Sequence, residues 1–135
     1  MKWTPEYSIG IEELDREHQA YFEIVDKLGS ALQLGCATDL LVELTETLIV
    51  KAERHFEHEQ AEMRRWSYPN TTAHIAEHDQ ALGQLAELQQ QALHDGTNQL
   101  ALQLAQNMEQ WLLRHVLVAD TELGAWVTQM RAAQL

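Results

Sequence analysis

The sequence predicts an all-α protein: a single domain over residues 1–135, folded as an antiparallel up-down-up-down four-helix bundle with an extended N-terminal arm. Three observations predict this fold class. Hydrophobic residues make up 45% of the chain, and only two prolines and six glycines interrupt it. Four stretches carry a stripe of side chains at alternating intervals of three and four residues, which is the spacing of one helix face. The connections between these stretches are short, as in a bundle of antiparallel neighbours.

The first segments of the chain predict an arm and then a helix. Residues 1–11 contain Pro5 and Gly10 and show no sustained period, so we expect them to form an extended arm. The first helix is expected over residues 12–34. Gly35 is expected to end this helix, because a residue without a Cβ readily adopts the left-handed conformation. One histidine interrupts the otherwise apolar or aromatic stripe, which reads Leu14, His18, Tyr21, Val25, Leu28 and Leu32.

The second helix is expected over residues 39–66, with Thr38 or Asp39 as its N-terminal cap. A turn at residues 67–70 follows, where Pro69 prevents the helix from continuing. Two polar side chains occupy positions on this stripe where the period calls for an apolar residue. The stripe consists of Leu41, Leu44, Leu48, Ala52, His55, Glu59, Met63 and Trp66.

The third helix is expected over residues 71–93 and the fourth over residues 97–118, with a turn at residues 94–97 between them. Residues 121–135 are expected to form a C-terminal tail, with a weak point at Gly124. Both helices carry histidines on the stripe. The third stripe reads His74, His78, Leu82, Leu85, Leu88 and Ala92, and the fourth reads Ala101, Leu104, Met108, Trp111 and His115.

Six polar side chains therefore stand at core positions, and together they predict a metal centre. Any one of them is most simply a core residue with a hydrogen-bond partner. Burial of a polar group without a partner costs about 1–3 kcal/mol, and a domain with a net stability of about 5–15 kcal/mol cannot carry six. Five imidazoles and a carboxylate are too many ligands for one tetrahedral zinc ion. They suit two first-row ions, with iron as the leading candidate. The six are His18, His55, Glu59, His74, His78 and His115.

Asp120 is the expected second bridging carboxylate. It lies five residues after His115, and on a regular helix this spacing separates the two side chains by about 140° around the axis. If both residues bind metal, the helix is expected to be distorted there. The distortion is either a π-bulge or a helix end at Ala119.

With these residues in place, the sequence resembles the hemerythrin family, specifically the single-domain bacteriohemerythrins, over nearly the whole chain. The resemblance implies two non-haem iron ions, bridged by Glu59, Asp120 and an oxo or hydroxo group. It also implies that one iron is held by His74, His78 and His115 and the other by His18 and His55. The matching segments are Trp3, Gly10-Ile11, Leu14-Asp15 with His18, His55-Phe56 with Glu59, His74 with His78, and Trp111-Leu112 with His115 and Asp120.

The resemblance implies a binding function and not an enzyme: dioxygen binds reversibly at an open position of the second iron, for oxygen carriage, storage or delivery. Tyr21 lies three residues after His18 on the same helix face. It is expected either to pack as a core aromatic or to donate a hydrogen bond to the bound oxygen. The other expected walls of the oxygen pocket are core side chains within a turn of the ligands: Phe22, Phe56, Trp111 and Leu112.

Other functions remain open from the sequence alone. Residues 74–78 fit the H-x-x-E-H pattern of certain zinc peptidases, with Glu77 as general base, but the pattern is short and such enzymes need a third ligand and a substrate cleft. A di-iron oxidase or iron-handling protein of the ferritin-like class would use Glu-x-x-His pairs, which the four stripes lack. An oxygen or redox sensor that acts through a separate partner would use the same site. His58 and His94 are expected on the surface, without a metal role.

Charge and cysteine content limit the partners and the compartment. The net charge of −12 argues against nucleic acid or an anionic membrane as a partner. Cys36 is the single cysteine, which excludes an internal disulfide and fits a reducing compartment. Residues 1–5 contain no apolar run suited to a signal peptide or a membrane span. We expect a cytoplasmic monomer whose partners are dioxygen and either an oxygen-consuming enzyme or a signalling protein.

Overall fold

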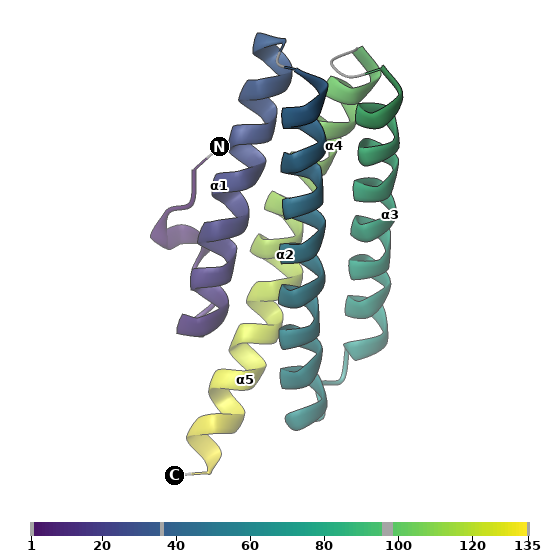
Figure 1. The fold of residues 1–135 in the computed structure, drawn as a ribbon. Coiled ribbons are helices and arrows are strands. Elements are labelled where there is room, and N and C mark those ends of the chain that lie inside the picture. The colour runs from purple at the N-terminus through teal and green to yellow at the C-terminus, as the bar shows by residue number, and fades with distance from the viewer. Residues whose placement is uncertain (1, 36, 96–98, 135) are drawn as a thin grey trace.

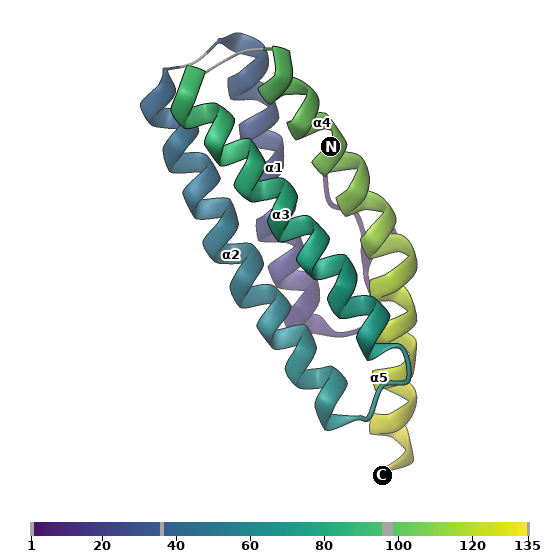
Figure 2. The same cartoon turned by 90° about the vertical axis from the view of Figure 1, so that its right-hand side faces the viewer.

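The predicted all-α four-helix bundle is confirmed by a computed structural model, which describes residues 2–35, 37–95 and 99–134. The long helical rods lie side by side in Figures 1 and 2, and the last of them is formed by consecutive helical segments. No strand occurs in the described ranges. The elements are the 3-10 helix η1 (Pro5–Tyr7), α1 (Glu12–Leu34), α2 (Thr38–Arg65), α3 (Thr71–Asp95), α4 (Gln99–Arg114), the π-helix η2 (His115–Asp120) and α5 (Thr121–Ala133).

The connections at one end of the bundle are only partly described. Gly35 follows α1 with φ 71° and ψ 54°, the left-handed conformation, and its N–H points to the carbonyls of Ala31 and Leu32. Cys36 and residues 96–98 lie outside the described residues, and so does the expected first residue of the fourth helix, Thr97.

The expected C-terminal tail is instead a helix, and the predicted weak point at Gly124 is wrong. α5 continues directly from η2, so α4, η2 and α5 form one rod (Figure 1). Gly124 lies inside α5 and is buried. A Cβ at this position would lie 2.0 Å from the carbonyl oxygen of Ile9, so only glycine lets the N-terminal arm pack this closely. The glycine therefore serves close packing and not helix termination.

The N-terminal arm is fastened to the start of α1 and contains one turn of 3-10 helix, so it is not extended throughout. The carboxylate of Asp15 accepts a hydrogen bond from the backbone N–H of Ile9, 2.9 Å away. The side chains of Ile9 and Ile11 are buried in the core. These contacts close the end of the bundle to which α5 also packs.

The core runs along the bundle, and its described buried side chains are apolar except for Thr45 and one compact polar group, described below. Its fully buried apolar residues include Leu41, Leu48, Leu85 and Ala101. Within the described part of the chain, no helix is both long enough and apolar enough to cross a membrane.

Candidate metal centre

The seven predicted ligand side chains lie together in the core, and each is at most 5% exposed. Every rod of the bundle contributes, because each histidine or carboxylate stands on the stripe that its helix turns inward. The contributors are His18 from α1, His55 and Glu59 from α2, His74 and His78 from α3, and His115 and Asp120 from η2.

The π-helix turns His115 and Asp120 toward the same point. A regular helix would hold the two side chains far apart around its axis, but η2 spans these six residues with a wider turn. As a result, Nε2 of His115 lies 3.0 Å from Oδ1 of Asp120. The Thr121 hydroxyl donates a 2.9 Å hydrogen bond to the Val116 carbonyl five residues earlier, which stabilises the widened turn. Of the two distortions considered from the sequence, the structure has the π-helix.

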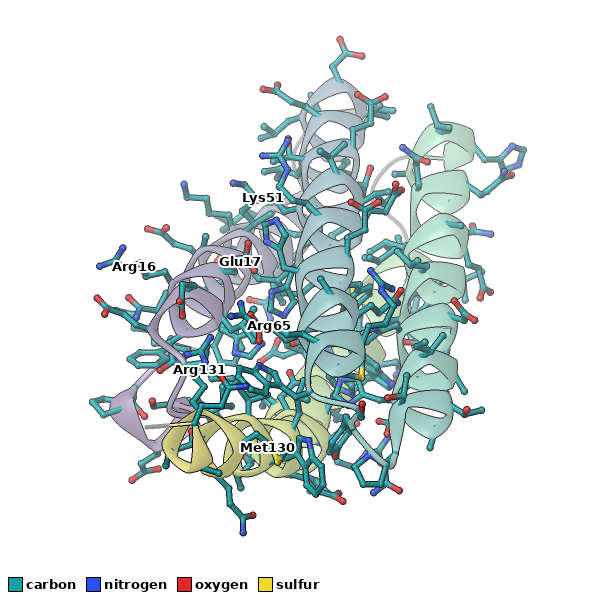
Figure 3. All side chains as sticks on the ribbon, turned by 90° about the horizontal axis from the view of Figure 1, so that it is seen from below. Arg16, Glu17, Lys51, Arg65, Met130 and Arg131 are labelled. Atoms are coloured by element: carbon teal, nitrogen blue, oxygen red, sulfur yellow. The ribbon has the colours of Figure 1, made fainter. Side chains whose placement is uncertain are left out.

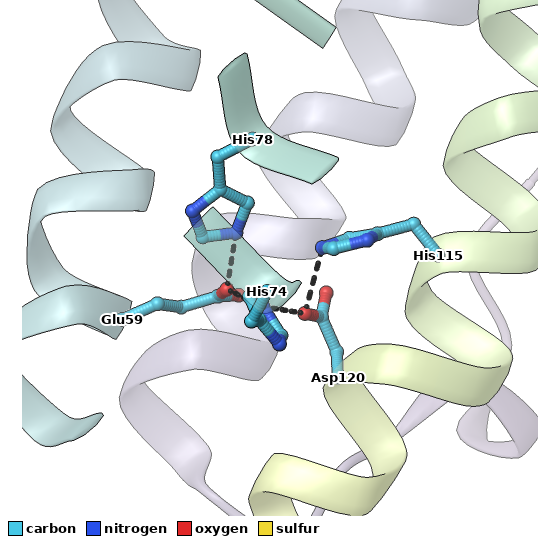
Figure 4. A group of neighbouring side chains, drawn as sticks. All are labelled: Glu59, His74, His78, His115 and Asp120. Atoms are coloured by element: carbon cyan, nitrogen blue, oxygen red, sulfur yellow. Dashed lines mark hydrogen bonds and ion pairs between the residues drawn. The ribbon is translucent and has the colours of Figure 1, made fainter. Parts of the chain in front are cut away.

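Three imidazoles face one oxygen of each carboxylate, as Figure 4 shows. Oε1 of Glu59 lies 2.9 Å from Nε2 of His74 and 2.9 Å from Nε2 of His78. Oδ1 of Asp120 lies 3.0 Å from Nε2 of both His74 and His115. Ligand atoms of these five residues all lie within 4.8 Å of one another. We call this group the three-histidine side.

Two further imidazoles face the other oxygen of each carboxylate. Oε2 of Glu59 lies 2.7 Å from Nε2 of His55 and 3.5 Å from Nε2 of His18. Oδ2 of Asp120 lies 3.1 Å from Nε2 of His18. Ligand atoms of these four residues also lie within 4.8 Å of one another. In this two-histidine side, both carboxylates are shared with the three-histidine side, which is the arrangement of a carboxylate that bridges two ions.

Mutual attraction within the cluster outweighs the effect of burial on several pKa values. Burial lowers the pKa of His55, but Glu59 and Glu17 raise it, to about 10 overall. Burial also lowers the pKa of His74, but its hydrogen bonds to Asp120 and Glu59 raise it to about 9. Burial raises the pKa of Glu59, yet His55 and its other imidazole neighbours hold it well below the ordinary value. The raised pKa values of His55 and His74 and the lowered pKa of Glu59 favour protonated rings paired with an ionised carboxylate in the iron-free protein.

Ion pairs alone leave the site incompletely satisfied. Burial lowers the pKa of His78 more than Glu59 raises it, so the neutral form of this ring is favoured. Nitrogen lone pairs and carboxylate oxygens are donors that first-row metal ions accept. The residues therefore fit two metal ions, one on each side of the shared carboxylates. Among the described residues, several buried atoms of the cluster lie close to an oppositely charged neighbour but form no hydrogen bond of regular geometry: Nε2 of His18, His55 and His115, Oε2 of Glu59 and Oδ1 of Asp120.

Three outer residues contact the Nδ1 atoms of the ligand rings, a role that the sequence does not predict for any of them. Oε1 of Glu17 lies 2.8 Å from Nδ1 of His55, and Oε1 of Glu77 lies 3.0 Å from Nδ1 of His115. The Gln60 amide lies 3.4 Å from Nδ1 of His78. All three contacts orient an imidazole, and the two carboxylates, which accept from Nδ1–H, also select the tautomer whose Nε2 lone pair faces the metal. Glu17 and Glu77 are each 38 residues from their partner ring, so no local spacing in the sequence indicates either contact.

The position of Glu77 also argues against the zinc-peptidase interpretation. Its carboxylate contacts the outer nitrogen of His115 and therefore lies on the far side of that ring from the clustered Nε2 atoms. A general base must instead reach the reacting water at the metal.

A small cavity adjoins the two-histidine side. The centre of a water-sized molecule has about 10 Å³ in which to move there, which is room for about one small molecule. Four of the five predicted wall residues line it, but Phe22 does not: its ring packs on Tyr7, with centroids 5.1 Å apart, and lines a groove beside Trp3. Phe22 follows Tyr21 by one residue and so points about 100° away around the helix. The lining is His18, Tyr21, His55, Phe56, Trp111, Leu112, His115 and Asp120.

The fold and the site together define a class of protein, a four-helix bundle with a histidine-rich dinuclear metal site. The chain belongs to the hemerythrin family, because its residues 9–127 match the hemerythrin HHE cation binding domain. The hemerythrin domain binds two iron ions, and hemerythrins bind dioxygen. The chain is therefore a di-iron, oxygen-binding domain.

Individual relatives agree with this assignment. The bacteriohemerythrin of Methylococcus capsulatus is 30% identical over 125 residues, which cover 92% of this chain and 94% of the relative. The hemerythrin subunit beta of Lingula anatina is 31% identical over 106 residues, covering 73% and 81% of the two chains. The crystal structure of a wild-type hemerythrin is similar with a TM-score of 0.82 and 28% identity, over 94% of this chain and 97% of that one.

Proposed function

We propose that this protein binds dioxygen reversibly, for carriage, storage or delivery, and that it is not an enzyme. The proposal includes the ligand assignment, which the division of carboxylate oxygens between the two sides supports. One iron is held by His74, His78 and His115 and the other by His18 and His55, with Glu59 and Asp120 as bridges.

The cavity is the observation on which the proposal rests. The two-histidine side has one imidazole fewer than the three-histidine side, and both of its rings line the cavity. An open coordination position therefore coincides with the space for a ligand. That space admits about one small molecule, whereas an oxidase that acts on an organic substrate needs a pocket of roughly 300–1,000 Å³.

The side chains around the cavity perform the protein's part of the function. When bound, two ferrous ions supply the two electrons that dioxygen accepts on binding and returns on release. Phe56, Trp111 and Leu112 present apolar surface to the cavity and keep water away from the bound oxygen. The ring of Trp111 stacks on that of His115 with centroids 4.5 Å apart, and this contact also holds the ligand ring in place.

An optical spectrum through one oxygen cycle tests the proposal. The iron-loaded protein is reduced without air, exposed to air and returned to an oxygen-free atmosphere. A visible charge-transfer band that appears and disappears with oxygen over several cycles supports a carrier. Immediate and irreversible oxidation refutes reversible carriage.

A second candidate is an oxygen sensor that responds by oxidation and acts through a separate partner. The position of Tyr21 favours it, because this residue lines the cavity and burial raises the pKa of its phenol, which remains a proton donor. A donor beside bound oxygen promotes loss of the oxygen in protonated, reduced form. For either role we infer a cytoplasmic monomer, with an oxygen-consuming enzyme or a signalling protein as its partner.

A further inference from the structure

The outer face of His55 leads to the protein surface through two side chains. Nδ1 of His55 lies 2.8 Å from Oε1 of Glu17, and Oε2 of Glu17 makes a very short contact with Nδ1 of His58. The chain of contacts thus runs from a ring of the two-histidine side, across a carboxylate of α1, to a second histidine of α2 one turn from the first.

The exposure of these side chains increases steadily outward. The side chain of His55 is 6% exposed, that of Glu17 is 26% exposed and that of His58 is 54% exposed. Glu17 and His58 both line a surface groove, together with Glu13 and Glu62. Figure 3 shows Glu17 on the side of α1 that faces α2. His58, which the sequence places on the surface without a role, is therefore connected to the site.

We propose that Glu17, anchored from outside by His58, is the positioning residue for His55 and controls how firmly the cavity-side metal ion is retained. The proposal rests on the assignment of His55 as a ligand of that ion. It concerns His58 and Glu17 as a unit, because without His58 the carboxylate of Glu17 is held only by its contact with His55 and competes with solvent in the groove.

The physical argument is that Glu17 fixes both the tautomer and the direction of the ring. When a metal ion takes the place of the proton on Nε2, the Nδ1–H donated to Glu17 keeps the lone pair of His55 on Nε2, the atom that lies 2.7 Å from Glu59. The carboxylate also makes the ring a stronger electron donor to a metal. Loss of such an outer partner lowers metal affinity by about 10–100-fold.

The opposite side of the centre provides an internal comparison. Glu77 contacts Nδ1 of His115 at 3.0 Å, and its side chain is 42% exposed. Loss of the Glu77 carboxylate is therefore expected to weaken the ion of the three-histidine side, whereas loss of the Glu17 carboxylate weakens the other ion.

Release of zinc from the zinc-loaded protein tests the proposal without oxygen or redox chemistry. Excess chelator is added, and the ring nitrogens of the individual histidines are followed by NMR, so that each side reports its own metal. Glu17→Gln should release the metal of His18 and His55 about 10–100-fold faster and alter the His55 Nδ1–H signal. His58→Ala should have a smaller effect on the same side, and Glu77→Gln should act on the other side. Glu13→Gln is the matched control, because it removes the same charge from the same groove without contact to His55.

Several results would overturn the proposal. Equal acceleration by Glu13→Gln would mean that charge in the groove is responsible and not the hydrogen bond. Equal release from both sides in Glu17→Gln would mean general loosening of the bundle, and an unchanged rate in His58→Ala would remove the anchor. A wild-type protein that does not hold two zinc ions would overturn the ligand assignment as well. Failure to bind oxygen reversibly, with the expected zinc release, would refute the proposed function alone.

Discussion

Replacement of Glu59 by glutamine tests the shared carboxylates most directly. The carboxylate is fully buried, and its two oxygens approach the Nε2 atoms of His74 and His78 on one side and of His18 and His55 on the other. Glutamine has nearly the same shape but only one oxygen and no charge. One ion therefore loses a ligand, and the two ions lose a negative charge between them. We expect metal analysis to find at most one iron per chain, against two in the wild type.

The same substitution has a measurable cost in the iron-free protein. Removal of one partner from a buried ion pair destabilises a protein by about 3–5 kcal/mol, because the other charge stays buried without compensation. The partner that remains is chiefly His55, whose ring lies 2.7 Å from Glu59 and has a pKa of about 10; it keeps its outer contact with Glu17, so the lower end of this range is expected. For a domain of this size, a loss of about 1 kcal/mol lowers Tm by a few degrees. Calorimetry should therefore show a Tm about 10 °C lower for the variant than for the wild type.

The pH dependence of the stability of the iron-free protein tests the same ion pairs independently. His55 and His74 have folded-state pKa values of about 10 and 9, above the ordinary value of 6.5. Their stabilisation of the iron-free protein is therefore complete below about pH 6.5 and is lost as the pH rises toward 9–10. This loss should be smaller in Glu59→Gln. Glu46→Gln is the control, because it removes an exposed carboxylate from the same helix. Retention of two irons by Glu59→Gln, or a Tm equal to that of the control, would refute the bridging role.

Three further predictions concern the metal and the cavity. Removal of iron from the wild-type protein should leave far-ultraviolet circular dichroism nearly unchanged but lower Tm substantially, since metal binds only the folded state; equal melting curves would mean that the histidines are satisfied without metal. Leu112→Ala should open the cavity to water and small anions. Stopped-flow spectra should then show faster spontaneous oxidation of the oxygenated protein. An unchanged rate would place Leu112 away from the oxygen. Tyr21→Phe keeps the ring but removes the hydroxyl, so it should slow that oxidation with iron content unchanged; an equal or faster rate would make Tyr21 an ordinary core aromatic.

Local sequence spacing is sufficient to identify the four helices of the bundle and the polar group in its core, but not the C-terminal helix α5. His18, His55 and His115 stand on stripes that each helix must bury, and this follows from the helical period alone. The same period showed that Asp120 can join His115 only if the helix is distorted. Spacing does not distinguish a π-bulge from a helix end, because the helix continues past Asp120 only if the following segment can pack against another part of the protein.

The segment after Asp120 shows why local signals failed at the C-terminus. Glycine is a poor helix former, and nothing near Gly124 in the sequence indicates that a helix continues through it. Its role comes from Ile9, more than a hundred residues earlier, whose carbonyl oxygen occupies the space of a Cβ. A close contact between distant segments leaves no periodic trace in either of them.

The sequence by itself thus determined the four long helices of the bundle, their inward faces, the polar residues that those faces bury and the family resemblance that implied two irons, but not the C-terminal helix α5. Only the tertiary structure decided that Tyr21 and not Phe22 lines the cavity, that each shared carboxylate turns one oxygen to each side, and that Glu17 supports His55. The physical reason is geometric. The period of a helix fixes the angles between side chains around one axis, but the rotation and height of each helix relative to its neighbours are set by packing of the whole bundle.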